Sequence, residues 1–181
     1  MTALDNDALI AACQLNSPPP VAVHRTRVRH FILDRGGYFM VPAIVLSEYL
    51  FKFDLPERKD EFNELLRLHV QVPPFDQLAA EIAADLGKRF AAGRTLASVA
   101  RRYGTDRICL KADLLIEATV LRHQAKDFVT NDSLAHDIAV FAGIDSHLLT
   151  TLPDPPATSP PIPPSPPTPM HSPPTLFPLD P

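Results

Sequence analysis

The sequence predicts an α/β fold built on a short-stranded, mainly parallel sheet with helices on both faces. Short apolar stretches alternate with longer segments in which apolar residues recur at helical spacing. Glycine, proline and acidic turns separate these segments. Such alternation is typical of βαβ units, whose right-handed crossovers restrict the sheet to a few doubly wound strand orders.

The N-terminal third of the chain predicts two strands, each followed by helical sequence. A serine before three prolines at 17–20 is typical of a helix start, and a glycine pair at 36–37 is typical of a helix end. In order, we expect a strand at Thr2–Leu4, the opening of a helix at Ala8–Ala12, a helix from Ser17 to Leu33, a strand at Tyr38–Val41 and a helix at Ala43–Phe53.

The chain continues to alternate after residue 53. The segment from Leu114 to Leu121 is apolar around most of its circumference, which predicts a buried helix with Asp113 in its first turn. The other expected elements are a helix at Pro56–Leu68, a strand at Val70–Val72, helices at Phe75–Phe90 and Thr95–Tyr103, a strand at Asp127–Thr130, a helix at Ser133–Phe141 and an edge strand at Asp145–Leu149.

Proline content divides the chain into two parts. We expect one folded domain over residues 1–152, long enough for a substantial core. Residues 153–181 are proline-rich, so we expect an extended polyproline II or disordered tail there. A flexible end is the simpler interpretation of the tail, and a PxxP-type ligand for a partner is the alternative.

Charge and cysteine usage limit the class of protein. The formal net charge of −4 argues against a strongly basic nucleic-acid binder. Basic residues still cluster locally, and four are candidate RNA contacts, with solvated helix faces as the alternative: Arg101, Arg102, Arg107 and Lys111. Cys13 and Cys109 have no metal-like spacing, so we expect reduced thiols in a cytoplasmic protein. We expect neither a signal peptide nor a membrane helix.

Four acids fall where the predicted fold directs them toward one edge of the sheet. With a strand order of 3-2-1-4, Asp5 and Asp132 leave neighbouring strands at their carboxyl ends, where ligand sites lie in open α/β sheets. Asp113 and Glu48 lie on helices that can reach the same crevice. Carboxylates that converge without basic partners repel one another, and a divalent cation removes the conflict. Oxygen ligands suit Mg²⁺ or Mn²⁺, either of which can activate a water at a phosphodiester.

Each of these acids also has a purely structural explanation. Asp5 can shape a strand-to-helix turn, and Glu48 can face solvent from its helix. Asp113 can be a first-turn acid favoured by the helix dipole, and Asp132 can be the N-cap of the following helix. The joint pattern favours a metal site, because all four positions point to the same edge.

The acids occur in four short motifs: LDNDALIAA at 4–12, PAIVLSEYL at 42–50, KADLLIEATVL at 111–121 and FVTND at 128–132. In this order and spacing they resemble the acidic motifs of PIN-domain ribonucleases of the VapC-like toxin type. The resemblance implies a three-layer α/β/α sandwich and a metal-dependent endoribonuclease for single-stranded RNA, often the toxin of a VapBC-type pair. It implies that the metal-binding catalytic acids are Asp5, Glu48, Asp113 and Asp132, supported by Asp7 and Thr130.

The chain departs from the family pattern in three places. Glu117 occupies a position where a small residue is common, so it either adds an acid to the site or repels Asp113 across the helix face. The region at 91–107 is longer and more basic than a minimal toxin needs, and the proline-rich tail has no counterpart in the family core.

Two other function classes stay open at this point. Asp5 and Asp7 fit the DxD opening of haloacid-dehalogenase-type phosphatases, with Asp5 as nucleophile and Asp7 as acid and base, although the downstream motifs are missing. A non-catalytic PIN-like module that binds RNA or protein is the other alternative. The candidate partners of the nuclease are RNA, an antitoxin protein and a second copy of the chain.

Overall fold

A parallel sheet of five short strands forms the centre of the molecule, in the order β3-β2-β1-β4-β5. This computed structural model describes residues 1–13, 19–52, 63 and 70–156. The predicted order of the first four strands is therefore confirmed, and the fifth strand joins the edge beside β4. The strands are β1 (Thr2–Leu4), β2 (Phe39–Met40), β3 (Val70–Gln71), β4 (Asp127–Thr130) and β5 (Asp145–Leu148).

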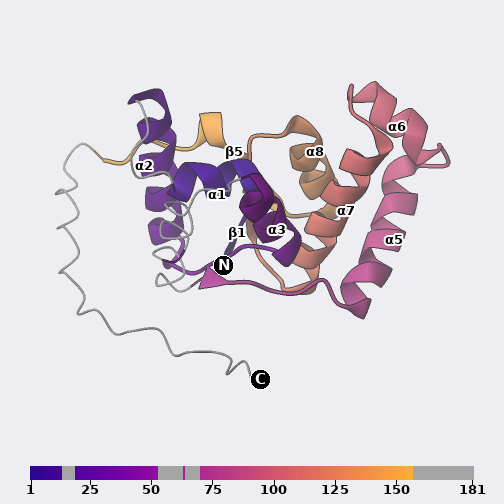
Figure 1. Cartoon of the computed structure of the whole chain (residues 1–181), viewed down its shortest axis with the longest axis horizontal. Coiled ribbons are helices and arrows are strands. Elements are labelled where there is room, and N and C mark those ends of the chain that lie inside the picture. Colours follow the sequence, from indigo (N-terminus) through magenta and orange to yellow (C-terminus); the bar gives the residue numbers. More distant parts are fainter. Residues whose placement is uncertain (14–18, 53–62, 64–69, 157–181) are drawn as a thin grey trace, which may run out of the picture.

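Helices connect these strands and cover both faces of the sheet. Their bounds are α1 (Asn6–Cys13), α2 (Pro19–Asp34), α3 (Ala43–Lys52), α5 (Gln77–Ala91), α6 (Leu96–Arg102), α7 (Arg107–Arg122) and α8 (Ser133–Ala142), followed by the 3-10 turn η1 (Leu149–Thr151). Figure 1 shows α1 and α2 on one side of the strands and α5, α7 and α8 on the other, which makes the molecule an α/β/α sandwich. No helix in these ranges is long and apolar enough to cross a membrane.

Some sequence predictions concern residues beyond the described ranges. The helix expected at Pro56–Leu68, apart from residue 63, lies outside them, as do the Ser17 cap and the tail from residue 157. The first residues of the predicted tail are described. Asp154 accepts a hydrogen bond of 2.7 Å from the Arg27 Nε on α2.

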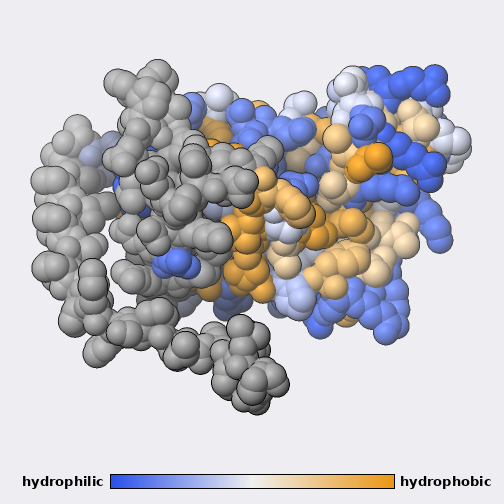
Figure 2. Space-filling model, viewed as in Figure 1, coloured by the Kyte–Doolittle hydropathy of each residue, from blue (hydrophilic) through white to orange (hydrophobic). Residues whose placement is uncertain are grey.

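The core fills the space on both sides of the sheet. The central strands are apolar on both faces, as expected for parallel strands covered by helices, and Leu4 and Phe128 are fully buried. A second cluster joins α5, α6, α7 and α8 around the fully buried Leu110 and Ile138. On the face in Figure 2, apolar residues gather over α3, whereas hydrophilic residues dominate around α6.

Helix α7 begins earlier than the sequence predicted. Asp106 is its N-cap, because the Asp106 carboxylate accepts hydrogen bonds from the main-chain N–H groups of Ile108 and Cys109 at 2.7 and 2.8 Å. The prediction that Asp113 lies in the first turn is therefore wrong: Asp113 is the seventh residue of a helix that starts at Arg107. The Asp113 carboxylate is too far from the start of α7 for the helix dipole to explain why an acid occurs at this position.

Two helix ends predict opposite outcomes for a glycine–alanine exchange. Helix α8 is followed by Gly143 at φ 84°, and helix α5 by Ala92 at φ 48°, so both residues are left-handed. We expect Gly143→Ala to lower the free energy of unfolding by roughly 1 kcal/mol and Ala92→Gly to raise it by a smaller amount. Urea denaturation measures both. A Cβ at Gly143 meets no atom within 4 Å, so a shift in the same direction for both variants would contradict the backbone explanation.

Candidate active site

Asp5 lies at the carboxyl end of β1, where the chain turns into α1. Its main-chain N–H donates to the carbonyl of Val129, which extends the pairing of β1 and β4 up to the site. Its carboxylate is 9% exposed and accepts hydrogen bonds from the Asn6 N–H at 2.7 Å and the Thr130 hydroxyl at 2.8 Å. Burial nevertheless raises the pKa of Asp5 to about 6, because the two donors only partly offset the lost hydration.

Asp132 follows the neighbouring strand β4 and is the N-cap of α8. Its Oδ1 accepts hydrogen bonds from the N–H groups of Leu134 at 2.6 Å and Ala135 at 3.3 Å. The structure therefore confirms that Asp132 caps this helix, as considered from the sequence. The cap fixes the carboxylate at the carboxyl edge of the sheet beside Asp5, so it positions Asp132 for a ligand site as well.

Thr130 links the two aspartates. Its hydroxyl, fully buried at the end of β4, donates to Asp5 Oδ2 and accepts from the main-chain N–H of Asp132 at 2.9 Å. The hydroxyl therefore uses one donor and one acceptor to fix the spacing of two strand ends.

Removal of this hydroxyl gives a measurable cost. We expect Thr130→Val to lower the free energy of unfolding by roughly 1–3 kcal/mol at pH 8, because Asp5 Oδ2 is left buried without its donor. Thr130→Ser keeps the hydroxyl and is the matched control. The difference between Val and Ser, measured by urea denaturation, is expected to shrink at pH 5, where Asp5 is mostly protonated. Equal losses in Val and Ser at both pH values would mean that the hydrogen bond contributes nothing.

Asp113 projects into the same space from α7. Burial, which is the largest cause, and the negative charges of Asp132, Asp5 and Glu48 together raise the pKa of Asp113 to about 7. The three other predicted acids therefore lie within electrostatic range of Asp113. A carboxyl group held close to half-protonated at neutral pH is typical of a functional site.

Glu48 and Asp7 take different positions around this group. Glu48 is half-buried on α3, which packs on α1 and α7, and its charge raises the pKa of both Asp5 and Asp113. Asp7 is exposed in the first turn of α1 and acts on the pKa of Asp5 from there. The structure thus brings Asp5, Glu48 and Asp113 together with Asp132, and it leaves Asp7 at the rim.

The chain was compared with known proteins. No family model matches it, and no curated protein matches it by sequence. Among solved structures, it is similar to FitAcB from Neisseria gonorrhoeae, with a TM-score of 0.53, 19% identity, and coverage of 84% of this chain and 100% of that chain. It is also similar to VapBC2 from Rickettsia felis bound to a DNA fragment from their promoter, with a TM-score of 0.56, 14% identity, and coverage of 81% and 97%.

The chain has a PIN-like fold. The α/β/α sandwich expected from the four motifs is confirmed at the level of architecture, since both likenesses span nearly all of the compared chains. At 14–19% identity the likeness concerns the fold, and the chemistry of the site depends on the residues of this chain.

Glu117 is the acid that departs from the family pattern, and the PIN-like fold buries it completely. It lies one turn after Asp113 on the same face of α7, and neither of its carboxylate oxygens has a hydrogen-bond partner among the residues that the structure describes. Burial raises the pKa of Glu117 well above its usual value, and the charges of Asp5 and Asp113 add to the shift. The charge of Asp113 acts on Glu117, which agrees with the repulsion considered from the sequence, and a role of Glu117 as an added acid of the site stays a prediction.

Asn6 was not singled out from the sequence. It is 7% exposed at the start of α1, and its Oδ1 is buried without a partner. Its position directly after Asp5 was the available signal, since a polar residue between two acids in a strand-to-helix turn faces the same edge. The Asn6 oxygen is therefore a further candidate for the group of oxygens around Asp5.

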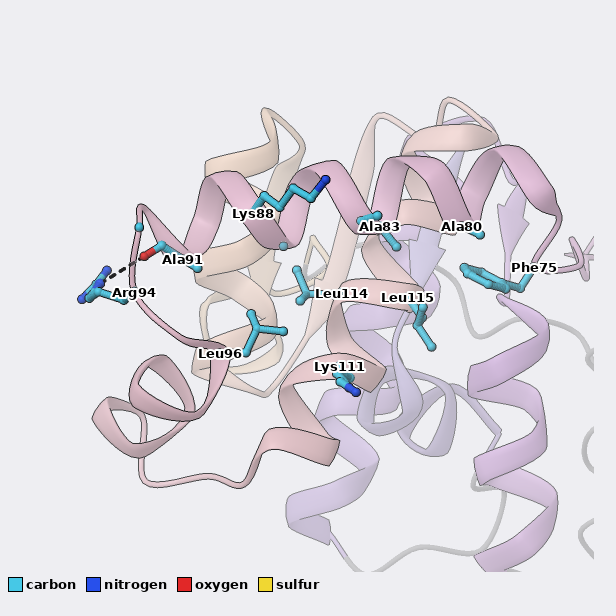
Figure 3. A pocket seen from close by; sticks show the side chains of 13 residues that line it. Phe75, Ala80, Ala83, Lys88, Ala91, Arg94, Leu96, Lys111, Leu114 and Leu115 are labelled. Atoms are coloured by element: carbon cyan, nitrogen blue, oxygen red, sulfur yellow. Dashed lines mark hydrogen bonds between the residues drawn. The ribbon is translucent and has the colours of Figure 1, made fainter.

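The four basic residues proposed as RNA contacts are exposed, but they do not surround Asp113. Arg101 and Arg102 lie at the end of α6, and Arg107 begins α7. Lys111 is two residues from Asp113, so the helix turns it to roughly the opposite face. There it lines a cavity of about 720 Å³ between α5 and α7, where it lies across from Ala83 and Lys88 in Figure 3. Their role in RNA binding stays a prediction.

The donor set of the PIN-like site suits a divalent cation. The acids offer oxygen donors only, and two buried oxygens of Glu117 have no partner, so a hard cation would satisfy both charge and hydrogen-bonding capacity. Among the described residues, no three His, Cys, Asp or Glu side chains are already grouped closely enough to hold a metal ion. Side-chain rotation of the acids is therefore needed to close a coordination sphere.

Proposed function

We propose that the chain is a divalent-metal-dependent endoribonuclease that hydrolyses phosphodiester bonds of single-stranded RNA. The observation that carries the proposal is the convergence of four carboxylates from β1, α3, α7 and β4 at one edge of a PIN-like sheet. The negative charges of Asp132, Asp5 and Glu48 add to the effect of burial in raising the pKa of Asp113, and the charge of Glu48 acts on Asp5 in the same direction. Raised pKa values of this kind are typical of functional sites.

Asp5, Glu48, Asp113 and Asp132 would hold Mg²⁺ or Mn²⁺. Such an ion, when bound, activates a water and stabilises the leaving oxygen of a phosphodiester. Thr130 orients Asp5, and the cap of α8 orients Asp132, so two of the acids are positioned before any ligand arrives. Asp113, with a pKa of about 7, gives up its proton readily when positive charge approaches.

The fold also supports a partner proposal. VapBC2 is a complex that was solved with a promoter DNA fragment, and the four motifs of this chain resemble VapC-type toxins. We infer that the chain is the toxin of a toxin–antitoxin pair in the cytoplasm, with RNA as substrate and an antitoxin as inhibitor. A second copy of the chain is a further candidate partner.

The test is cleavage of end-labelled single-stranded RNA by the full chain. We expect cleavage with Mg²⁺ or Mn²⁺, none after treatment with EDTA, and recovery when the metal is restored. RNA binding without cleavage under any metal condition would favour the non-catalytic module. Turnover of a small phosphate monoester, with an aspartyl-phosphate on Asp5 and no RNA cleavage, would favour the phosphatase. Either result would overturn the nuclease proposal.

A further inference from the structure

We propose that Glu117 is a fifth carboxylate ligand of the divalent cation, on the inner wall of the site beside Asp5 and Asp113. This inference rests on the proposed function for the presence of the cation. It assigns to this chain a ligand that the four acidic motifs do not include.

The burial of Glu117 is the first observation behind this proposal. The side chain is 0% exposed, and in the described part of the chain neither Oε1 nor Oε2 has a hydrogen-bond partner. A buried polar group without a partner costs free energy, and a buried unpaired charge costs considerably more. A small or apolar residue would fill this position of α7 without that cost. A buried acid here therefore indicates a ligand that the polypeptide does not itself supply.

The position of Glu117 on α7 is the second observation. Glu117 follows Asp113 by four residues, which places the two side chains on the same face of α7. The charges of Asp5 and Asp113 act on the buried Glu117 carboxyl group, so both aspartates lie within electrostatic range of it. Within the described ranges, neither oxygen of this carboxyl group has a hydrogen-bond partner.

The chemistry of this inner position favours a cation from solution. Asp5, Asp113 and Glu117 supply carboxylate oxygens from the end of β1 and from α7. The charges of Asp5 and Asp113, which act on Glu117, are both negative. Mg²⁺ and Mn²⁺ prefer such oxygen ligands. A cation bound there neutralises part of the repulsion and satisfies the orphaned oxygens of Glu117 at the same time.

The experiment measures Mn²⁺ binding by the full-length protein in the absence of RNA, from the electron paramagnetic resonance signal of free Mn²⁺. Glu117→Gln keeps the shape of the side chain and removes its charge, and Glu117→Ala removes both. We expect both variants to weaken Mn²⁺ binding by at least about tenfold. The matched control is Glu81→Gln, an exposed residue of α5, which is expected to bind Mn²⁺ as wild type does.

Thermal unfolding adds a second readout. Without metal, the Tm of Glu117→Gln relative to that of wild type is expected to rise with pH, because only wild type has a carboxyl group there whose charged form burial disfavours. With saturating Mn²⁺ the rise in the Tm of Glu117→Gln is expected to be smaller than in wild type, because tighter binding gives the larger stabilisation.

The outcomes separate this inference from the proposed function. If wild type and Glu117→Gln bind Mn²⁺ equally and Mn²⁺ raises their Tm by the same amount, Glu117 is not a ligand, while the nuclease proposal stands. If wild type binds neither Mn²⁺ nor Mg²⁺, the metal site as a whole is wrong and both proposals fail. If Glu117→Gln does not fold, Glu117→Ala decides by the same two measurements, and failure of both to fold would assign Glu117 to the structure and overturn its role as a ligand.

Discussion

Asp113→Asn is expected to reduce RNA cleavage by roughly 10²–10³-fold while the metal-free protein stays folded. Asparagine keeps the size of the side chain but removes a charged ligand from the centre of the site. A bound metal contributes several kcal/mol of transition-state stabilisation, and each 1.4 kcal/mol or so corresponds to a factor of ten in rate. Initial rates on labelled single-stranded RNA at saturating Mg²⁺ measure the loss.

The Asp113 experiment has a matched control and a stability readout. Asp145→Asn changes an exposed acid at the start of β5, at the opposite edge of the sheet, and is expected to cleave at the wild-type rate. Asp113→Asn is expected to melt at or above the wild-type temperature in EDTA at pH 8, because a poorly solvated charge is removed. Cleavage at the wild-type rate would show that Asp113 is not part of the site.

The metal-free protein is expected to lose stability as the pH rises from about 4 to 7. Asp5 and Asp113 have folded-state pKa values of about 6 and about 7, both raised from 3.8 mainly by burial. The folded state therefore holds these protons more tightly than the unfolded state, so the stabilisation is complete below pH 3.8 and is lost as the pH passes 6 to 7. The loss is on the order of 3 kcal/mol for Asp5 and about 4 kcal/mol for Asp113.

Melting temperatures in EDTA at pH 5.5 and pH 8 test this dependence. We expect the lower value at pH 8 and a larger rise on addition of Mg²⁺ there. Asp76 and Asp106 do not obscure the effect, since main-chain N–H donors lower their pKa values and they titrate at more acid pH. Asp113→Asn should flatten the profile. A wild-type profile that is level or rises between pH 5.5 and 8 would contradict burial as the dominant cause.

Much of the fold could be predicted from the sequence because its signals are local. Strands such as Asp127–Thr130 are short apolar runs that end in turn residues, and their predicted bounds agree with the structure within a residue or two. The start of α7 was missed, because the capping signal of Asp106 stands in a polar stretch that also fits a loop. Its consequence was the wrong placement of Asp113 within the helix.

The candidate site was predictable in outline but not in its electrostatics. Strand order placed Asp5 and Asp132 at one edge, since topology alone brings the carboxyl ends of neighbouring parallel strands together. Burial is a tertiary property, so the sequence did not reveal that Glu117 is enclosed with both oxygens unpartnered. For the same reason, the sequence did not reveal that Lys111 lines the cavity between α5 and α7, on a different face of the helix from Asp113.

The partners of Asp5 and Asp132 have a consequence for selectivity. Their hydrogen bonds come from main-chain N–H groups and the Thr130 hydroxyl, all of which are neutral. Neutral donors of this kind hold the carboxylates in place and leave their charge uncancelled, whereas a lysine or arginine would neutralise it. A cation bound by Asp5 and Asp132 would therefore meet carboxylates that neutral donors hold in place, and their negative charge would attract a divalent ion more strongly than a monovalent one.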